Sequence, residues 1–296
     1  MPSFGFCVME ETQVPQVQPD PPRVTVIIIT RNQARALRRC LEALHQCTIL
    51  DEIEIIVVDN ASTDGSNVIQ DDFEKITYLK LPKNFGWTKA ANIALRSSLA
   101  ESILFLDPRV ELAPDAIAAL AAEVSEESDA AAASAVMTSP DGTPACVMRK
   151  LPKPDDLRPV LFAPSVLPTD PTPADFPGVF ALLIRKPFLK GMNFLDERYG
   201  ELWADAEIAA QVKRAGRKIL LLPAAKAVFH EADAPPLLHS SLLEADFEQG
   251  AATYLSKHYG GGMGRRVTAA LGALGTLKVG LFANLLSGQK IDGSQE

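Results

Sequence analysis

Residues 54–66 read EIIVVDNASTDGS, an apolar run that ends in an aspartate and a polar loop. The run at 54–58 is rich in β-branched residues, which is typical of a strand buried on both faces of a parallel sheet. Residues 24–30 (VTVIIIT) have the same character. Leucines at helical spacing over residues 35–46 separate the two runs, so this region predicts a strand–helix–strand unit.

The alternation of strand and helix continues downstream. Apolar runs predict strands at 76–81, 102–106, 179–184, 218–222 and 227–230. Helical spacing predicts helices at 66–73, 88–100, 114–125, 203–215 and 240–258. Strands that alternate with helices imply an α/β fold with a mostly parallel central sheet flanked by helices, and a helical extension follows it.

Polar residues follow three of the predicted strands. They occupy positions 30–32, 59–64 and 107–109. Ligands of such sheets bind outside the carboxyl ends of the strands, so these residues are expected to share one crevice. A dinucleotide-binding dehydrogenase would need a glycine-rich turn after the first strand, and Thr30-Arg31-Asn32-Gln33 contains no glycine.

Composition restricts the partners of the chain. The 296 residues carry a formal net charge of −8 and no basic stripe, so a nucleic-acid partner is not expected. The four cysteines fit no zinc pattern and are interpreted as small buried hydrophobic residues, which favours a reducing, cytoplasmic setting.

The chain divides into three expected parts. Residues 1–22 are expected to be a disordered leader, 23–235 one large domain, and 236–296 a helical extension. Within the domain, residues 140–177 contain ten prolines and predict a long loop. Residues 267–286 have the length of a membrane span, but Lys278 and weak apolar content argue against one. Two interpretations of this segment remain: a helix packed on the domain, or a helix that lies on a membrane surface or on a partner.

The loop at 58–66 resembles the signature of family 2 glycosyltransferases with the GT-A fold. Five further elements occur in the family's order over roughly residues 23–232. They are Asn84-Phe85-Gly86-Trp87 with Ala91-Asn92, Leu106-Asp107-Pro108-Arg109, residues 194–199, residues 204–208, and Gly216 with Pro223 and His230. The chain is most similar to the bacterial rhamnosyltransferase-like enzymes that build cell-surface polysaccharides.

The resemblance implies a UDP- or dTDP-sugar donor. Asp59 would accept a hydrogen bond from the base, although a loop-capping role is the alternative. The other residues expected at the substrates are Thr30, Asn32, Asn84, Gly86, Lys89, Asn92, Asp107, Arg109 and Gly178. Arg31 replaces a usual aromatic residue and would either reach a phosphate or face solvent.

The resemblance also places Asp107 where the family holds Mg²⁺ or Mn²⁺ against the diphosphate. Arg109 replaces the last carboxylate of that motif, and arginine cannot bind a metal. Either Arg109 itself pairs with the diphosphate, or the metal site and the activity are lost together. His230 matches a histidine that can complete the metal shell, with a purely structural role as the alternative.

Asp205 matches the family's catalytic base, which takes the proton of the acceptor hydroxyl in an inverting transfer. Its neighbours depart from the motif at Ala204, Glu207 and Gln211. Two hypotheses follow. One is a cytoplasmic transferase acting on a polysaccharide or lipid-linked glycan, with peripheral contact to the plasma membrane through the C-terminal helix. The other is a non-catalytic relative that binds a nucleotide or a partner.

Overall fold

Strand β1 (Val24–Thr30) forms the middle of the parallel half of the sheet. Its branched side chains are buried on both faces, and it pairs in parallel with β2 (Ile53–Asp59) and β4 (Ser102–Leu106). β3 (Ile76–Lys80) extends this half in parallel beyond β2. The computed structural model describes residues 20–145, 148–157, 161–162, 167–233, 240–260, 262 and 266.

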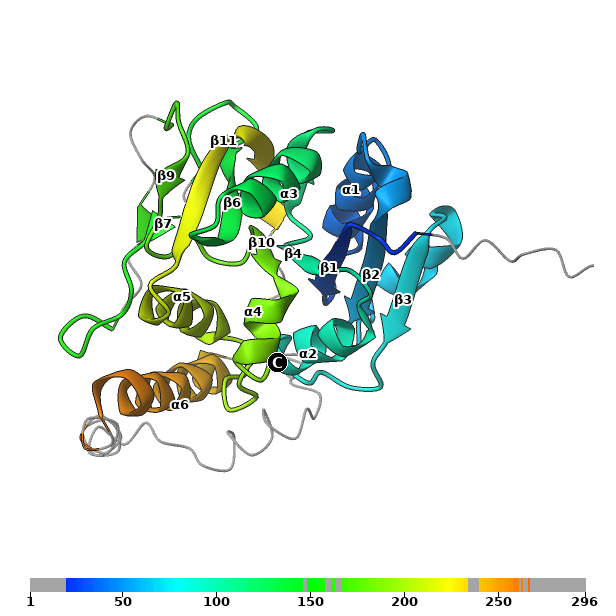
Figure 1. Ribbon diagram of the computed structural model, residues 1–296. Helices are drawn as coiled ribbons and strands as arrows, with labels where there is room; N and C mark the ends of the chain where they lie inside the picture. The colour runs from blue at the N-terminus through cyan, green and yellow to red at the C-terminus, as the bar shows by residue number, and fades with distance from the viewer. Residues whose placement is uncertain are drawn as a thin grey trace, which may run out of the picture.

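The whole sheet has the order β3-β2-β1-β4-β10-β6-β11-β5, and β9 pairs with β11 (Figure 1). The strands of its second half are β5 (Val110–Leu112), β6 (Ala130–Thr138), β9 (Thr172–Pro173), β10 (Ala181–Arg185) and β11 (Lys218–Phe229). β10 runs antiparallel to both β4 and β6, while β11 is parallel to β6. The expected α/β class is confirmed, and the sheet as a whole is mixed.

Helices cover both faces of the sheet (Figure 1). They are α1 (Ala34–Leu44), α2 (Trp87–Ser97), α3 (Ala116–Glu126), α4 (Lys186–Gly191), α5 (Ala204–Arg214) and α6 (Ser240–Tyr259). Successive side chains of a strand point to opposite faces. Val26 and Ile28 therefore pack in the core with α1 and α3, whereas Ile27 packs in the core formed with α2, α4, α5 and α6.

Strand β6 is an element that the sequence pattern did not predict. Its sequence, AAAASAVMT, is mostly alanine, which is uncommon in strands. The strand is nevertheless buried between β10 and β11, and α3 packs against it. Small side chains suit this position because neighbouring elements approach it closely.

Other differences are local. The helix expected at 66–73 is the 3₁₀-helix η2 (Ser66–Asp72), and the two strands expected at 218–222 and 227–230 form the single strand β11. A register shift between Leu222 and Lys226 interrupts its pairing with β6. The remaining short elements are η1 (Leu50–Glu52), η3 (Glu231–Asp233), β7 (Met148–Arg149) and β8 (Leu161–Phe162).

Two expectations fall outside this description. The expected leader at 1–22 lies outside the described residues up to residue 19, and so does the whole apolar segment 267–286. Among the helices that the structure describes, none combines the length and apolar character needed to cross a membrane.

Ala133 offers a test of the packing around β6. It is fully buried and lies between Leu183 of β10 and Leu220 of β11. We expect Ala133→Val to lower the free energy of unfolding by about 1–3 kcal/mol, because added methyl groups overpack a filled site. Urea denaturation measures the change. Ala224→Val, at an exposed position of β11, is the control, and equal stability of the two variants would contradict the packing described.

Candidate active site

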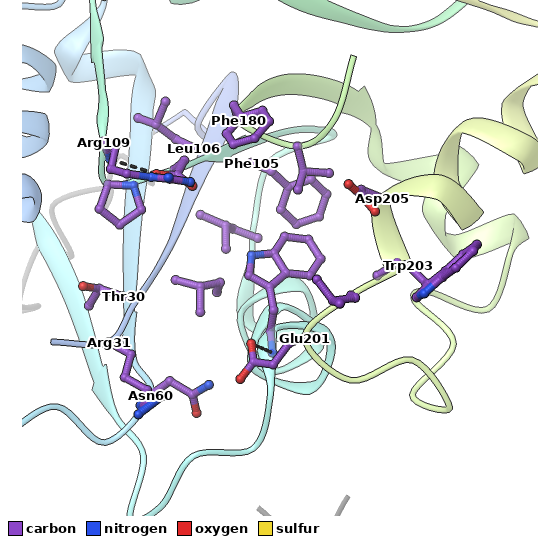
Figure 2. A pocket seen from close by; sticks show the side chains of 18 of the residues that line it. Thr30, Arg31, Asn60, Phe105, Leu106, Arg109, Phe180, Glu201, Trp203 and Asp205 are labelled. Atoms are coloured by element: carbon purple, nitrogen blue, oxygen red, sulfur yellow. Dashed lines mark hydrogen bonds and ion pairs between the residues drawn. The ribbon is translucent and has the colours of Figure 1, made fainter. Parts of the chain in front are cut away.

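A cavity of about 390 Å³ lies where β1 and β4 end and α5 begins (Figure 2). Its polar lining consists of Thr30, Arg31, Gln33, Asn60, Asp107, Arg109, Glu201 and Asp205. The rest of the wall is largely apolar and includes Trp87, Phe105, Phe176, Phe180, Trp203 and Phe247. The cavity therefore combines a few charged groups with a wide aromatic surface, as ligand pockets commonly do.

The end of β2 is held beneath the loop that follows it. Asp59 is fully buried, and its Oδ1 accepts a hydrogen bond from the Ser62 N–H at 2.7 Å. Its Oδ2 accepts no hydrogen bond of ordinary geometry in the described part of the chain, and the nearby Tyr78 hydroxyl donates to the Ser66 carbonyl. One carboxylate oxygen of Asp59 thus caps the loop and the other is left without a donor.

Asn32 fastens the same loop to the end of β1. Its φ of 51° turns the backbone into the left-handed region, which asparagine tolerates better than most residues. The side-chain Oδ1 accepts a hydrogen bond from the Thr63 N–H at 2.7 Å, and the Asn32 N–H donates to Ser62 Oγ. Asn32 does not line the cavity, whereas Thr30 does.

Asn84 and Gly86 shape the turn into α2. Asn84 Oδ1 accepts hydrogen bonds from Asn60 Nδ2 at 2.6 Å and from the Gly86 N–H at 2.9 Å. Gly86 has a φ of +79°, and a Cβ there would lie 3.3 Å from the carbonyl carbon of Gly200. Glycine is required by both the backbone angle and this close approach. Neither residue lines the cavity directly.

Two further predicted residues of α2 also lie away from the cavity. Asn92 donates to the Leu195 carbonyl at 2.8 Å and accepts from the Leu195 N–H at 3.0 Å, so it joins α2 to the 194–199 segment. The Lys89 ammonium lies 5.0 Å from the centroid of the Phe85 ring. The motif at 84–92 therefore contains residues that support the cavity wall as well as Trp87, which lines the cavity.

Asp107 and Arg109 form an internal ion pair in the turn after β4. Arg109 Nε and Nη2 donate to the two oxygens of Asp107, each at 2.9 Å, and the Arg109 N–H donates to Oδ1. The guanidinium carbon also lies 5.7 Å from the Phe180 ring and 4.9 Å from the Phe229 ring. Burial alone would lower the pKa of Arg109, but its hydrogen bonds to Asp107 raise it. The arginine is therefore a fixed cation.

Gly178 helps to place one of those rings. Its φ is +78°, and a Cβ at this position would lie 3.0 Å from two ring carbons of Phe180. A larger residue would displace Phe180, which lines the cavity and stacks on Arg109.

The residues present do not fit a divalent metal at this position. Both oxygens of Asp107 are engaged by Arg109, and His230 Nε2 lies 3.0 Å from Glu111 Oε2, outside the cavity lining. Within the described ranges, no group of three or more His, Cys, Asp or Glu side chains is placed to hold a metal. Metal ligation by Asp107 and His230 stays a prediction without geometric support.

Asp205 enters the cavity from the first turn of α5. Figure 2 shows its carboxylate on the side of the cavity opposite Arg109. Its Oδ1 accepts a hydrogen bond from the Ala206 N–H at 2.8 Å. The neighbouring Trp203 has a φ of 78°, a backbone angle that a bulky residue adopts only when its surroundings impose it.

Glu207, two residues further along α5, has a different role. It is buried, and its oxygens lie 2.7 Å from Lys257 Nζ and 2.7 Å from His258 Nε2, both on α6. Gln211 Nε2 and the Tyr199 hydroxyl donate to the same carboxylate. Burial alone would raise the pKa of Glu207, but the hydrogen bonds from its partners lower it to about 2. This altered motif position therefore joins α5 to α6.

Sequence reasoning missed several residues of the wall. Glu201 accepts a hydrogen bond from the Trp87 N–H at 3.1 Å and lines the cavity, as do Phe105, Trp203 and Phe247. Trp87 lies inside the Asn84-Phe85-Gly86-Trp87 motif. The sequence therefore indicated that this position is near the site, but not that its side chain lines the cavity. Phe247 lies on α6, and only its apolar spacing within that helix could have drawn attention to it.

Comparison with known proteins identifies the class. Residues 25–191 match Glycosyl transferase family 2, and this chain belongs to that family. It is similar to an N-acetylglucosaminyltransferase of Mesorhizobium japonicum, with 31% identity over 129 residues that cover 40% of this chain and 30% of the relative. It is also similar to a teichoic acid poly(glycerol phosphate) polymerase of Staphylococcus epidermidis, with 34% identity over 100 residues that cover 32% of this chain and 14% of the relative.

Solved structures support the fold. TarS 1–349 of S. aureus in complex with UDP-GlcNAc gives a TM-score of 0.57 at 18% identity and covers 84% of this chain and 71% of that chain. GalNAc-T7 with UDP, GalNAc and Mn²⁺ gives 0.59 at 16% identity and covers 72% of this chain and 44% of that chain. The GT-A fold is thereby confirmed. The chain spans about a third or less of the length of the curated relatives named above.

The Glu207 cluster predicts a pH-dependent stability. We expect Glu207→Gln to lower the free energy of unfolding at neutral pH by about 3 kcal/mol, because it removes the buried carboxylate that Lys257 and His258 contact. Since the pKa falls from the ordinary 4.5 to about 2 on folding, the contribution is complete above pH 4.5 and is lost as the pH falls toward 2.

Urea denaturation of the wild-type and variant chains across that pH range measures the difference. Glu244→Gln, at an exposed position of α6, is the control. A stability difference that does not shrink at acidic pH would refute the assigned ion pairs.

Proposed function

We propose that this chain transfers a sugar from a nucleotide-sugar donor to a hydroxyl group of a glycan, with inversion and without a metal ion. The observation that carries the proposal is a single cavity with the Asp107–Arg109 pair at one side and the Asp205 carboxylate at the other. The relatives named above make UDP-N-acetylglucosamine the first donor to test, with dTDP-sugars next.

Asp59 is the proposed contact for the base. Its Oδ2 is buried and without a hydrogen-bond donor in the described part of the chain, and the imide N–H of uracil or thymine would supply one. A carboxylate left unpaired rejects bases that lack this donor, because burying it without a partner is costly. The loop at 60–64 would have to move to admit the base, since Asp59 is fully buried.

Arg109 is the proposed partner of the donor's diphosphate. Its charge is held in place by Asp107 and by two aromatic rings, so little reorganisation is needed when negative charge develops on the leaving group. A guanidinium also has five N–H donors, and Asp107 engages only part of them. The cation would thus serve the leaving nucleotide where other family members use a metal.

Asp205 is the proposed general base. It would take the proton of the acceptor hydroxyl while that oxygen attacks the anomeric carbon. The bond from the anomeric carbon to the phosphate oxygen breaks in the same step, and the nucleoside diphosphate leaves with the electron pair. One displacement inverts the anomeric configuration. The acceptor, a growing polysaccharide or a lipid-linked glycan at the cytoplasmic side of the membrane, would contact Phe176 and Phe180.

A non-catalytic scaffold is the second candidate. It is favoured by the engagement of both Asp107 oxygens and by Ala204 in place of a carboxylate beside Asp205. The role of Glu207 in joining α5 to α6 weakens this candidate, because that change in the motif does not reach the cavity.

Substitution of Asp205 separates the two candidates. We expect Asp205→Asn to reduce kcat for sugar transfer by about 100-fold or more, the usual contribution of a general base, without changing the affinity for UDP. Asp71→Asn, an exposed aspartate of η2, is the control. Transfer by the Asp205→Asn chain at the wild-type rate would eliminate the assigned mechanism.

Metal dependence tests the role of Arg109. Donor binding stabilises the native state by about 2.7 kcal/mol at a hundredfold excess over Kd, so thermal denaturation with UDP-N-acetylglucosamine reports it. We expect equal stabilisation of the wild-type chain in EDTA and in Mn²⁺. Arg109→Asp restores a second carboxylate, and its stabilisation by the donor should require Mn²⁺.

The matched control is Arg109→Ala, which removes the guanidinium without adding a ligand and should lose donor stabilisation under both conditions. A wild-type chain stabilised only in Mn²⁺ would show that Arg109 does not replace the metal.

A further inference from the structure

Helix α6 forms part of the cavity wall although it lies beyond the part of the chain that matches the family. The match ends at residue 191, and α6 begins at Ser240. Leu243 and Phe247 of α6 line the cavity. Facing α6 is the segment 200–203, which leads directly into the helix that carries Asp205. Figure 2 shows Glu201, Trp203 and Asp205 following one another along this path.

Asp246 of α6 binds the backbone of that segment. Its side chain is buried, and Oδ2 accepts hydrogen bonds from the Glu201 N–H at 3.1 Å and the Leu202 N–H at 2.9 Å. Its Oδ1 has no hydrogen-bond partner within the described ranges. Two backbone donors that lie just before α5 are therefore satisfied by one carboxyl oxygen from a distant helix.

Gly250, one turn further along α6, receives the side chain of Trp203. A Cβ at Gly250 would lie only 2.2 Å from Trp203 Cδ1, so no larger residue fits unless the indole moves. The indole also packs on Phe247 and Tyr254, with ring centroids 5.3 and 5.4 Å away. This packing accounts for the left-handed backbone of Trp203.

The opposite side of the segment is fixed to α2. Glu201 accepts hydrogen bonds from Asn84 Nδ2 and from the Trp87 N–H, and the Thr88 hydroxyl donates to the Gly200 carbonyl at 2.7 Å. The segment is thus held between the start of α2 and the middle of α6. Loss of the α6 contacts would free its backbone immediately before Asp205.

We propose that Asp246 is a positioning residue, which, with Gly250, sets the 200–203 segment and thereby the direction of Asp205 into the cavity. The expected effect on catalysis rests on the proposed function. The expected effect on the position of the 200–203 segment rests on the geometry alone.

Near neutral pH, Asp246 is present both as the neutral acid and as the carboxylate. Burial, together with the negative charge of Glu201, raises its pKa to about 7. Oδ2 accepts both backbone hydrogen bonds, so in the neutral acid the proton belongs on Oδ1. Asparagine has the same shape and keeps an acceptor oxygen, whereas leucine keeps the volume and removes the acceptor.

Trp203 fluorescence tests the structural part without any substrate. The chain has two tryptophans, so a Trp87→Phe background leaves Trp203 as the reporter. We expect Asp246→Leu and Gly250→Ala to shift the emission to longer wavelength and to raise quenching by acrylamide, and Asp246→Asn to match the parent. Glu244→Gln and Gly191→Ala, where an added Cβ meets open space, are the controls. Circular dichroism verifies folding, and Gly250→Ala carries the test if Asp246→Leu does not fold.

Turnover tests the catalytic part in chains that retain Trp87. For hydrolysis of the donor, we expect kcat of Asp246→Leu to fall at least about tenfold, because small displacements of a catalytic group are costly. Asp246→Asn should stay within about twofold of wild type. Unchanged fluorescence in both Asp246→Leu and Gly250→Ala, or equal damage by asparagine and leucine, would overturn the proposal. Shifted fluorescence with no turnover by the wild-type chain would refute the proposed function and leave the positioning of the segment intact.

Discussion

The parallel pairing of β1 with β2 and β4 sets Thr30 beside Asp59 and Ile28 beside Leu106. These strands are buried on both faces, so most of their side chains are apolar until the chain leaves the core. Polar groups consequently gather where the strands end, and three separate turns deliver them to the same edge. A slip of one residue in either pairing would exchange the two faces of a strand and dismantle this arrangement.

The Asp107–Arg109 pair places a positive charge at this edge of the sheet, where a metal-dependent relative would hold a cation with carboxylates. A metal site needs several free oxygen ligands, whereas here both carboxylate oxygens of Asp107 bind a guanidinium that packs against two aromatic rings. The result is a cation that belongs to the chain itself and cannot be removed by chelation. The sequence change that looks like the loss of a site can thus equally supply a preorganised charge.

Helix α6 gives the site its second support. Its far end carries Lys257 and His258, which contact the Glu207 carboxylate, and its middle carries Asp246 and Gly250, which contact the segment before Asp205. These contacts join α6 to the first turn of α5 and to the segment that precedes it. The helical extension is therefore part of the framework that places the candidate base.

The sequence by itself determined the buried strands of the first half, the polar turns at their ends and the family to which those turns belong. It did so because burial and turn formation leave periodic, local patterns. It could not determine the strand β6, whose alanines have no strand preference, or the mixed direction of the sheet.

The tertiary structure alone decided which side chains meet. The Asp107–Arg109 pair depends on rotamers and stacking, while Asn92 and His230 turn to partners outside the cavity. Asp246 reaches backbone groups that lie 44 and 45 residues earlier in the chain. Such contacts are set by how helices pack around the sheet, and no local sequence pattern records them.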